Sequence, residues 1–495
     1  MTPSRLWSSP IAGGILIGGA LALGHAPFYQ VWLAFPALVA FAIYMRHYGT
    51  SPKRAAWSGW IVGTAYFAIS LSWIINPFFV EPEKHAWMAP FAAILLPAGL
   101  ALFWAAGFAV MSRFAPPKLS WALGLIWAEL ARAYAFTGFP WGNVASFYVD
   151  TVAAQIVPVV GALGLSVVVI AVAQAVANVP NRLMLGVATI VAGIAIALPR
   201  PAPEPVGDGP LVRLVQPNAP QAQKWVPERA EVFYQRLLDA TAAEPRPDVI
   251  VWPETSVPYL MEFASPILQE IGEYGRGAPV VAGINRYVDG RYFNSLITID
   301  PDGSVPQVYD KRHLVPFGEY VPFGEVFAQL GIYGLAASQG GGFTAGEDGK
   351  LIFLPGIGAA VPLICYEGLF PALSHTDQSA RLILLITNDA WFGPAAGPEQ
   401  HLVQSQLRAL EQGLPVVRVA NTGITAMINA RGQITARLPM NEQGHLDAVL
   451  PPQTAVRPLF ATYGELPILL IVLISTGLGI AAMSRNRIDQ ANGGR

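Results

Sequence analysis

Residues 359–370 read AAVPLICYEGLF and include the only cysteine of the chain. The residues before Cys365 are almost all apolar, which is typical of a strand buried on both faces. A free cysteine is most often a packing residue. A single thiol also excludes an intrachain disulfide and a thiolate-rich metal cluster. Whether Cys365 packs or reacts therefore depends on the rest of the sequence.

Short β-branched and apolar runs of the same kind recur between residues 205 and 455, after the proline-rich linker PAPEPVGDGP. They lie at 211–218, 247–255, 278–287, 292–300, 359–368, 381–393, 414–423, 425–433 and 445–452. Helical patterns alternate with them at 227–243, 264–277 and 398–413. This mixture predicts an α/β sandwich in which helices cover the strands.

The rest of the chain is apolar enough for a membrane protein. Hydrophobic residues make up 53% and charged residues only 13%, whereas a soluble protein has about 25% charged residues. The net charge of −2 offers no basic field for nucleic acid. Long apolar stretches predict about eight transmembrane helices, at 8–25, 28–45, 56–79, 88–112, 119–136, 151–178, 182–199 and 463–484.

The first apolar stretch has an alternative interpretation. Arg5 precedes it and small residues follow it, which is also typical of a signal peptide. Because further apolar stretches come after it, we expect an uncleaved first helix.

The loop charges predict an orientation. Basic residues fall in alternate loops, all on one side of the expected spans: Arg46, Lys53, Arg54, Arg113, Lys118, Arg182, Arg485 and Arg487. The positive-inside rule makes that side cytoplasmic. Both termini are then cytoplasmic, and the α/β domain faces the other side of the membrane, which in a bacterium is the periplasm. The expected organisation is a membrane domain (1–204), a catalytic domain (205–455), and a last helix with a tail (456–495).

Two charges lie inside an expected span. Glu129 and Arg132 are three residues apart, so a helix places them on one face, where they can pair. Charges at membrane depth are costly and tend to pair or to line a cavity. The sequence leaves a structural ion pair and a role near a lipid path equally open.

Three polar residues follow apolar runs or lie between them, where open α/β sheets place their sites. Glu254 follows DVIVWP, Lys311 lies in VYDKRHLVPFGEYVPFGE, and Cys365 follows AVPLI. A cysteine nucleophile needs a base and a group that stabilises the oxyanion, and a carboxylate and an ammonium could serve. No histidine has an evident place in such a site, since His375 and His401 do not follow a strand.

At this point the chain resembles a known family. VWPETSVPY, YDKRHLVPFGEYVP, LICYEGLFP and TNDAWFGPAAGPEQH are similar to motifs of the nitrilase superfamily, whose triad is Glu-Lys-Cys. Together with the apolar stretches and GFPWGN, they resemble the apolipoprotein N-acyltransferase family over nearly the whole chain. The resemblance implies an αββα sandwich for the soluble domain.

The resemblance also implies roles for individual residues. Glu254 matches the general base, Lys311 the lysine that stabilises the transition state, and Cys365 the nucleophile. Further matches are an essential glutamate, the pair after the nucleophile, and a tryptophan on an arm near the lipid entrance, which correspond to Glu319, Tyr366, Glu367 and Trp225.

The implied reaction is a two-step acyl transfer. Cys365 takes the sn-1 acyl chain of a phospholipid, typically phosphatidylethanolamine, as a thioester and passes it to the diacylglyceryl-cysteine of a lipoprotein. Such chemistry needs no cofactor, ATP or metal. The sequence agrees, because the glycine-rich stretch 334–346 lacks the phosphate-loop pattern and no histidine pair has zinc-site spacing. The implied location is the bacterial inner membrane.

Two other functions fit parts of the pattern. One is a membrane-anchored amidase or hydrolase of the nitrilase superfamily, for which a single anchor would suffice. The other is a transporter with a degenerate nitrilase domain, against which the intact Glu-Lys-Cys set argues.

Overall fold

The computed structural model describes residues 9–322, 342–347, 349–375 and 379–492. Arg5 and the first part of the glycine-rich stretch, 334–341, lie outside these residues. The chain forms two compact units. One contains Met1–Ile75, Trp87–Pro201 and Thr462–Arg495, and the other contains Asn76–Ala86 and Ala202–Ala461.

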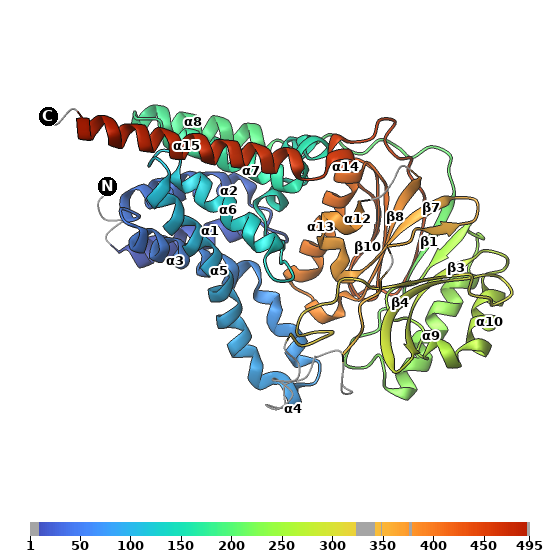
Figure 1. The fold of residues 1–495 in the computed structure, drawn as a ribbon. Helices are drawn as coiled ribbons and strands as arrows, with labels where there is room; N and C mark the ends of the chain where they lie inside the picture. The colour runs from blue at the N-terminus through green and yellow to red at the C-terminus, as the bar shows by residue number, and fades with distance from the viewer. Residues whose placement is uncertain (1–8, 323–341, 348, 376–378, 493–495) are drawn as a thin grey trace. The chain divides into compact units, whose positions relative to one another are not determined.

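The first unit is helical (Figure 1). Its principal helices are α1 (Pro10–Ala22), α2 (Val31–Tyr48), α3 (Pro52–Ser70), α5 (Ala89–Phe114), α6 (Ser120–Tyr134), α7 (Val157–Ala177), α8 (Arg182–Ala197) and α15 (Leu466–Asn492). Short 3₁₀ segments connect several of them: η1 (Ser72–Phe79), η2 (Ala86–Met88), η3 (Val144–Tyr148) and η4 (Val152–Ile156). The four-residue helix α4 (Pro82–His85), which precedes η2, and the part of η1 from Asn76 onward belong to the other unit.

Side-chain caps explain where some of these helices begin. The Ser51 hydroxyl accepts a hydrogen bond from the backbone N–H of Arg54, and Pro52 occupies the first helical position of α3. The Asn181 side chain accepts hydrogen bonds from two backbone N–H groups at the start of α8, 2.9 and 3.1 Å away. Such caps satisfy N–H groups that have no partner within the helix.

Each apolar stretch predicted from the sequence is helical, but the prediction of eight spans is only partly confirmed. Among the residues that the structure describes, four helical segments are long and apolar enough to cross a membrane: Val31–Tyr48, Pro82–Phe114, Val152–Ala177 and Leu466–Arg485. A fifth is reached if Pro52–Ser70 and Ser72–Phe79, which meet at a bend of 49°, count as one span.

The remaining predicted spans are shorter helices. α1 has 13 residues, α6 has 15 and α8 has 16. At about 1.5 Å per residue, each is shorter than the roughly 30 Å hydrocarbon core of a bilayer.

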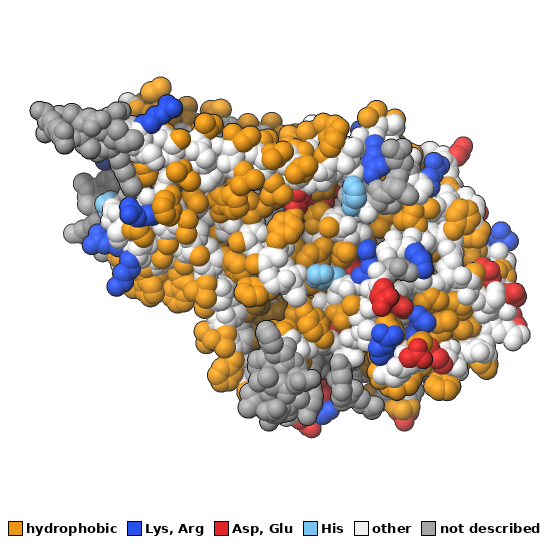
Figure 2. Space-filling model, viewed as in Figure 1, with side chains coloured by type: hydrophobic (Ala, Val, Ile, Leu, Met, Phe, Trp, Pro, Cys, Tyr) orange, Lys and Arg blue, Asp and Glu red, His pale blue; other side chains and the backbone are white. Residues whose placement is uncertain are grey.

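The outer faces of the helical unit are apolar. Figure 2 shows hydrophobic side chains over most of its visible surface. The exposed side chains of α8 and α15 include leucines and isoleucines, among them Leu183, Ile190, Leu470, Ile474 and Leu478. An exposed apolar surface of this extent marks contact with lipid or with another protein, and this supports a membrane protein.

The pair Glu129 and Arg132 is buried within this unit. The Arg132 guanidinium lies 2.5 Å from Oε2 of Glu129, and both side chains are nearly inaccessible. Arg132 also donates hydrogen bonds to the carbonyl oxygens of Phe139 and Trp141, and Trp104 Nε1 donates to Glu129 Oε1. Of the two roles left open by the sequence, this geometry favours the structural one, because the pair holds the turn after α6.

The second unit is a sandwich of two six-stranded sheets (Figure 1). The first sheet has the order β12 (Gly444–Val449), β1 (Leu211–Gln216), β2 (Val249–Val251), β3 (Val280–Val288), β4 (Arg291–Ile299) and β5 (Gln307–Asp310). The second has the order β11 (Ile434–Leu438), β10 (Thr425–Ile428), β9 (Val416–Ala420), β8 (Ala380–Thr387), β7 (Gly358–Ile364) and β6 (Ile352–Leu354).

Parallel pairing occupies the middle of each sheet. Strands β1, β2 and β3 are parallel in one sheet, and β7, β8 and β9 are parallel in the other. The outer strands pair antiparallel. Parallel strands end at the same edge of a sheet, so the residues that follow them are brought together.

The central strands are apolar at nearly every position because both faces of each sheet are covered. In β8, Leu384 faces the core between the sheets, while Leu385 faces the outer core that includes Leu402 of α13 (Ala396–Gln412). In the first sheet, Val251 faces inward and Ile250 faces the layer that includes residues of α9 (Pro227–Ala242) and α10 (Ser265–Tyr274). This arrangement confirms the predicted α/β sandwich, with an αββα layer order.

Nine strands and three helices match the ranges predicted from the sequence. Strands β5, β6 and β11 were not predicted. All three lie at the edges of their sheets. β5 and β11 contain polar residues, and β6 has only three residues, too few to show a strand pattern.

Candidate active site

Cys365 lies where β7 ends. Ile364 is paired with Ile386 of the parallel strand β8, so Cys365 and Thr387 leave the sheet next to each other. At Cys365 the backbone turns sharply into the 3₁₀ helix η6 (Cys365–Leu369), with a φ of 51°. This value is uncommon for a residue other than glycine and is found at functional sites. The thiol side chain is buried.

Glu254 follows β2 and points its carboxylate into the same site. Oε1 accepts a hydrogen bond of 2.7 Å from Asn294 Nδ2, and Oε2 accepts one of 2.7 Å from the backbone N–H of Asn388. Gly283 of β3 makes room for this turn, because a Cβ atom there would lie 2.6 Å from the Cα atom of Glu254. The carboxylate is therefore held in one orientation.

Lys311 comes directly after β5 and is 1% exposed. Its Nζ atom lies 2.9 Å from Oε1 of Glu319 and 3.6 Å from Oε1 of Glu254. Its backbone N–H donates to the carbonyl oxygen of Asn294. The structure thus brings together Glu254, Lys311 and Cys365, which come from three different strand ends.

The charged groups of the site have opposite effects on the pKa of the Cys365 thiol. Burial raises the pKa of the Cys365 thiol, the carboxylate of Glu254 raises it further, and the Lys311 ammonium lowers it, with a net rise. For Lys311, burial lowers the pKa, but the carboxylates of Glu319 and Glu254 outweigh burial and raise it above its usual value. The resting site therefore holds a neutral thiol beside a charged lysine.

Glu319 connects the Lys311 side chain to the loop that follows it in the chain. Oε1 accepts hydrogen bonds from Lys311 Nζ and, at 3.1 Å, from Asn294 Nδ2. Oε2 accepts one of 2.8 Å from the backbone N–H of Val315. Because Asn294 also donates to Glu254, one amide group bridges both carboxylates that face Lys311.

Glu367, next to the nucleophile turn, is fully buried. Its Oε2 atom accepts a hydrogen bond from the backbone N–H of Ile364, and its Oε1 atom accepts one from the backbone N–H of Arg312. The Tyr309 hydroxyl donates to the same carboxylate at 2.9 Å. Burial raises the pKa of Glu367. Glu367 therefore joins the loop of Lys311 to the turn of Cys365.

Tyr366 is buried with its ring against two aromatic neighbours. The ring centroids of Phe370 and His313 lie 5.1 and 5.6 Å from that of Tyr366. These contacts surround the turn with apolar surface.

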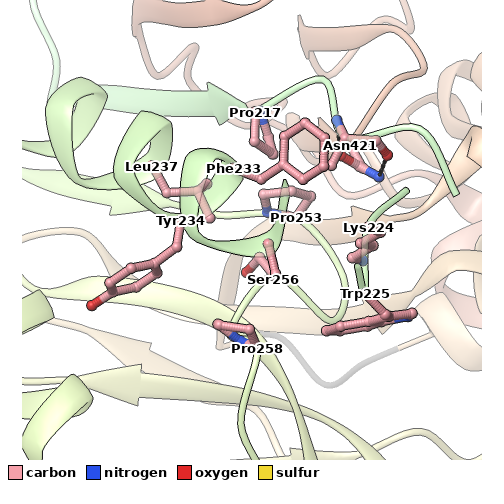
Figure 3. A pocket seen from close by; sticks show the side chains of 12 residues that line it. Pro217, Lys224, Trp225, Phe233, Tyr234, Leu237, Pro253, Ser256, Pro258 and Asn421 are labelled. Atoms are coloured by element: carbon pink, nitrogen blue, oxygen red, sulfur yellow. Dashed lines mark hydrogen bonds between the residues drawn. The ribbon is translucent and has the colours of Figure 1, made fainter. Parts of the chain in front are cut away.

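Trp225 lines a small pocket formed by α9, the segment before it and the turn after β2, where Pro253 and Ser256 flank Glu254 (Figure 3). Its ring is 46% exposed, and Lys224 Nζ lies 5.1 Å from the ring centroid. Lys224 is itself buried and donates hydrogen bonds to Thr255 Oγ1 at 2.8 Å and to the carbonyl oxygen of Glu254 at 3.2 Å. Burial lowers the pKa of Lys224 to about 8.

Several residues of the site were missed by the sequence prediction. Asn294 lies in the middle of β4, where nothing in the sequence distinguishes it from an ordinary strand residue. His401 ends the motif TNDAWFGPAAGPEQH but has no evident role from sequence; in the structure its Nε2 atom lies 3.1 Å from the carbonyl oxygen of Cys365. Among the described residues, no group of three His, Cys, Asp or Glu side chains is placed to hold a metal ion.

Two family models match the chain. Residues 211–457 match the carbon-nitrogen hydrolase family, and residues 17–175 match the apolipoprotein N-acyltransferase N-terminal domain. A crystal structure of a CN-hydrolase superfamily protein from Xanthomonas campestris is 19% identical, with a TM-score of 0.37 over 53% of this chain and 97% of that one.

Full-length relatives are closer. An apolipoprotein N-acyltransferase of Brucella suis is 36% identical over 97% of this chain and 97% of its own length. That of Sinorhizobium fredii is 38% identical over 80% of each chain. With both family models matched in order and identities above a third over most of its length, this chain belongs to the apolipoprotein N-acyltransferase family.

Proposed function

We propose that this enzyme N-acylates the N-terminal diacylglyceryl-cysteine of bacterial lipoproteins, with a phospholipid as acyl donor and a thioester on Cys365 as the intermediate. The observation that carries the proposal is the convergence of Glu254, Lys311 and Cys365 in one buried site. The family membership supplies the reaction class, and the site supplies a nucleophile, a base and a cation.

In the first half-reaction the thiol loses its proton to Glu254, and the thiolate attacks the carbonyl carbon of the sn-1 ester. The tetrahedral intermediate collapses with cleavage of the ester C–O bond. The lysophospholipid alkoxide leaves with the proton from Glu254, and the acyl chain remains on the sulfur. Because burial and Glu254 raise the pKa of the thiol, proton removal accompanies attack rather than preceding it.

In the second half-reaction the free amine of the diacylglyceryl-cysteine attacks the thioester. Glu254 takes a proton from the attacking nitrogen, and the C–S bond breaks as the thiol re-forms. One site thus serves two substrates in turn, which predicts ping-pong kinetics.

The oxyanion of both half-reactions lies beside Lys311. Its ammonium is held by Glu319 and is charged before the reaction starts. A backbone N–H near Tyr366 is the second donor that we propose. Such donors stabilise charge that develops only in the transition state.

We further propose the cellular arrangement that the sequence predicts. All eight apolar segments cross the bacterial inner membrane, both termini are cytoplasmic, and the domain at 205–455 is periplasmic. The domain boundaries are 1–204, 205–455 and 456–495. Both substrates are lipids, so a multi-pass protein places the thiol where acyl chains are available and water is scarce. Trp225 lies on the lipid-entrance side, and phosphatidylethanolamine is the expected donor.

The test uses the purified full chain and phosphatidylethanolamine with an isotope-labelled sn-1 acyl chain. Intact mass spectrometry should show the labelled acyl mass on Cys365. A diacylglyceryl-cysteine peptide added afterwards should remove the label from the protein and carry it as an amide. Lipid labelled at sn-2 is the matched control and should give an adduct of unlabelled acyl mass.

Two outcomes would overturn the proposal. One is an unlabelled protein together with full peptide acylation, which would remove the thioester. The other is release of the label as free fatty acid without transfer to the peptide, which would make the protein a membrane-anchored hydrolase.

A further inference from the structure

A cluster of buried charged side chains lies behind the nucleophile turn and has no part in the mechanism above. Asp389 begins the 3₁₀ helix η7 (Asp389–Phe392), His401 lies on α13 and Arg418 lies on β9. The side chains of Asp389, His401 and Arg418 are almost completely buried. Arg418 donates a hydrogen bond to Oδ2 of Asp389, so the carboxylate has its counter-charge inside the cluster.

The other carboxylate oxygen of Asp389, Oδ1, contacts two further side chains. Oδ1 lies 2.8 Å from Nδ1 of His401, and it accepts a hydrogen bond of 2.8 Å from the hydroxyl of Thr387. One oxygen atom is therefore the common partner of a histidine and a threonine that come from different elements.

Both of these side chains also reach Cys365. His401 Nε2 lies 3.1 Å from the carbonyl oxygen of Cys365. Because this oxygen and the Asp389 carboxylate at Nδ1 can both only accept, hydrogen bonds at both ends need a proton on each ring nitrogen. The Thr387 hydroxyl lies beside the thiol at the neighbouring strand end, and because its one hydrogen goes to Asp389, it can only accept from the thiol. Asp389 is thus connected to the nucleophile at two points, its backbone and its sulfur.

The cluster has little freedom to move. A Cβ atom at Gly423 would lie 2.3 Å from Oδ2 of Asp389, so the chain packs directly on the carboxylate. Burial by itself raises the pKa of Asp389, but Arg418 and His401 outweigh burial and lower it to about 2. Asp389 is therefore ionised throughout the physiological range.

We propose that Asp389 is a positioning residue for the nucleophile, which it fixes through His401 at the Cys365 carbonyl and through Thr387 at the thiol. The turn at Cys365 needs such support because its φ of 51° lies in the left-handed region, which costs energy for a side chain with a Cβ atom. Displacing a reacting atom by about 1 Å can lower a rate about a hundredfold. The inference rests on the proposed role of Cys365 as the nucleophile.

The test compares variants that remove a side-chain contact with Cys365 with variants that keep it. His401→Leu and Thr387→Val remove the donor to the carbonyl and the hydroxyl at the thiol. His401→Gln and Thr387→Ser keep a donor and a hydroxyl. The matched control is Gln406→Leu, which breaks a buried hydrogen bond from the same helix to the Gly432 carbonyl, away from the cluster.

Two rates are measured for each variant. One is single-turnover acylation by phospholipid as a function of lipid concentration. The other is alkylation of Cys365, the only cysteine, by iodoacetamide as a function of pH. We expect His401→Leu and Thr387→Val to lower the maximal acylation rate about tenfold to a hundredfold, with the half-saturating lipid concentration changed less than about twofold.

Three further results are expected. The retaining variants recover most of the rate. Thr387→Val moves the alkylation profile along the pH axis, because it removes the hydroxyl group beside the thiol. The double variant loses less than the product of the two single losses, since both connections end on Asp389.

The controls separate this inference from a loss of stability and from the proposed function. A merely structural role would lower the melting temperature of Gln406→Leu and the two removal variants alike, and would leave the alkylation profile in place. Wild-type acylation in both removal variants would overturn the positioning role. If wild type forms no acyl-enzyme, the proposed function fails, and the alkylation profiles still test the connection to Cys365. If one removal variant does not fold, the positioning role is tested with the conservative variant at the same residue and with both variants at the other residue.

Discussion

Lys311 and Glu319, eight residues apart in the chain, form a buried ion pair with 2.9 Å between Nζ and Oε1. The pairing keeps the ammonium charged in a place where burial alone would favour its neutral form. It also aims the ammonium, since Glu319 is anchored in turn by the backbone N–H of Val315. A fixed cation beside a neutral thiol is suited to an oxyanion that appears only during the reaction.

Substitution of Lys311 should therefore affect the chemical step. We expect Lys311→Ala to lower single-turnover acylation of Cys365 at saturating lipid by about 10²–10³, the usual cost of one oxyanion donor, or by more because thiolate stabilisation is lost as well. Lys311→Arg should lose less but still much of the rate, because a planar guanidinium cannot occupy the position of an ammonium. Phospholipid affinity should change little. Near-wild-type acylation in Lys311→Ala would remove this lysine from the mechanism.

Cys365→Ala should abolish both formation of the acyl-enzyme and acylation of the lipoprotein. Cys365→Ser should be nearly inactive, since a hydroxyl is much harder to deprotonate than a thiol with a usual pKa of about 8.5. Mass spectrometry and a peptide acylation assay on the purified variants test this. Full activity of Cys365→Ala would contradict the mechanism.

Asn294→Leu should lower the acylation rate although Asn294 is not expected to touch substrate. Its amide donates to Glu254 at 2.7 Å and to Glu319 at 3.1 Å, and its loss leaves two carboxylates facing each other without the bridge. Leucine has a similar volume, so packing of β4 is largely preserved. We expect a loss of about tenfold or more in single-turnover acylation, measured beside the melting temperature. An unchanged rate would show that Lys311 alone orients the two carboxylates.

Lys224 gives a prediction for stability against pH. Its pKa is lowered to about 8 in the folded protein, from 10.5. Between these values the unfolded chain binds more protons, so the free energy of unfolding rises with pH. Relative to Lys224→Met, wild type should therefore gain stability from pH 8 to 10.5, by about 3 kcal/mol at most. Melting temperatures of the two proteins across this range measure the gain, and a constant difference would contradict it.

The orientation in the membrane can be tested with single cysteines in Cys365→Ala. Glu273→Cys on α10 and Thr50→Cys in a basic loop introduce thiols at exposed positions. In intact cells with a permeabilised outer membrane, a reagent that cannot cross the inner membrane should label Glu273→Cys and leave Thr50→Cys unlabelled until lysis. The reverse pattern would refute a periplasmic catalytic domain.

The sequence by itself determined the parts of the molecule that depend on local pattern. Strands such as β8 could be predicted because both of their faces are buried, which makes nearly every residue apolar. Glu254, Lys311 and Cys365 could be singled out because they lie in motifs that resemble a known family. The apolar stretches predicted helices, and all of them are helical.

Only the tertiary structure decided what depends on neighbours distant in the chain. Asn294 bridges two carboxylates 40 and 25 residues away, and His401 reaches the carbonyl oxygen of Cys365 across 36 residues. Nothing local marks Asn294, and the motif that ends at His401 does not show what this histidine contacts. A polar side chain in a strand or helix looks the same in sequence whether its partner is water or a buried group. Helix lengths were likewise decided by the fold: α1, α6 and α8 end before the apolar pattern does. Hydropathy predicts where apolar residues gather, whereas caps, bends and packing determine where a helix stops.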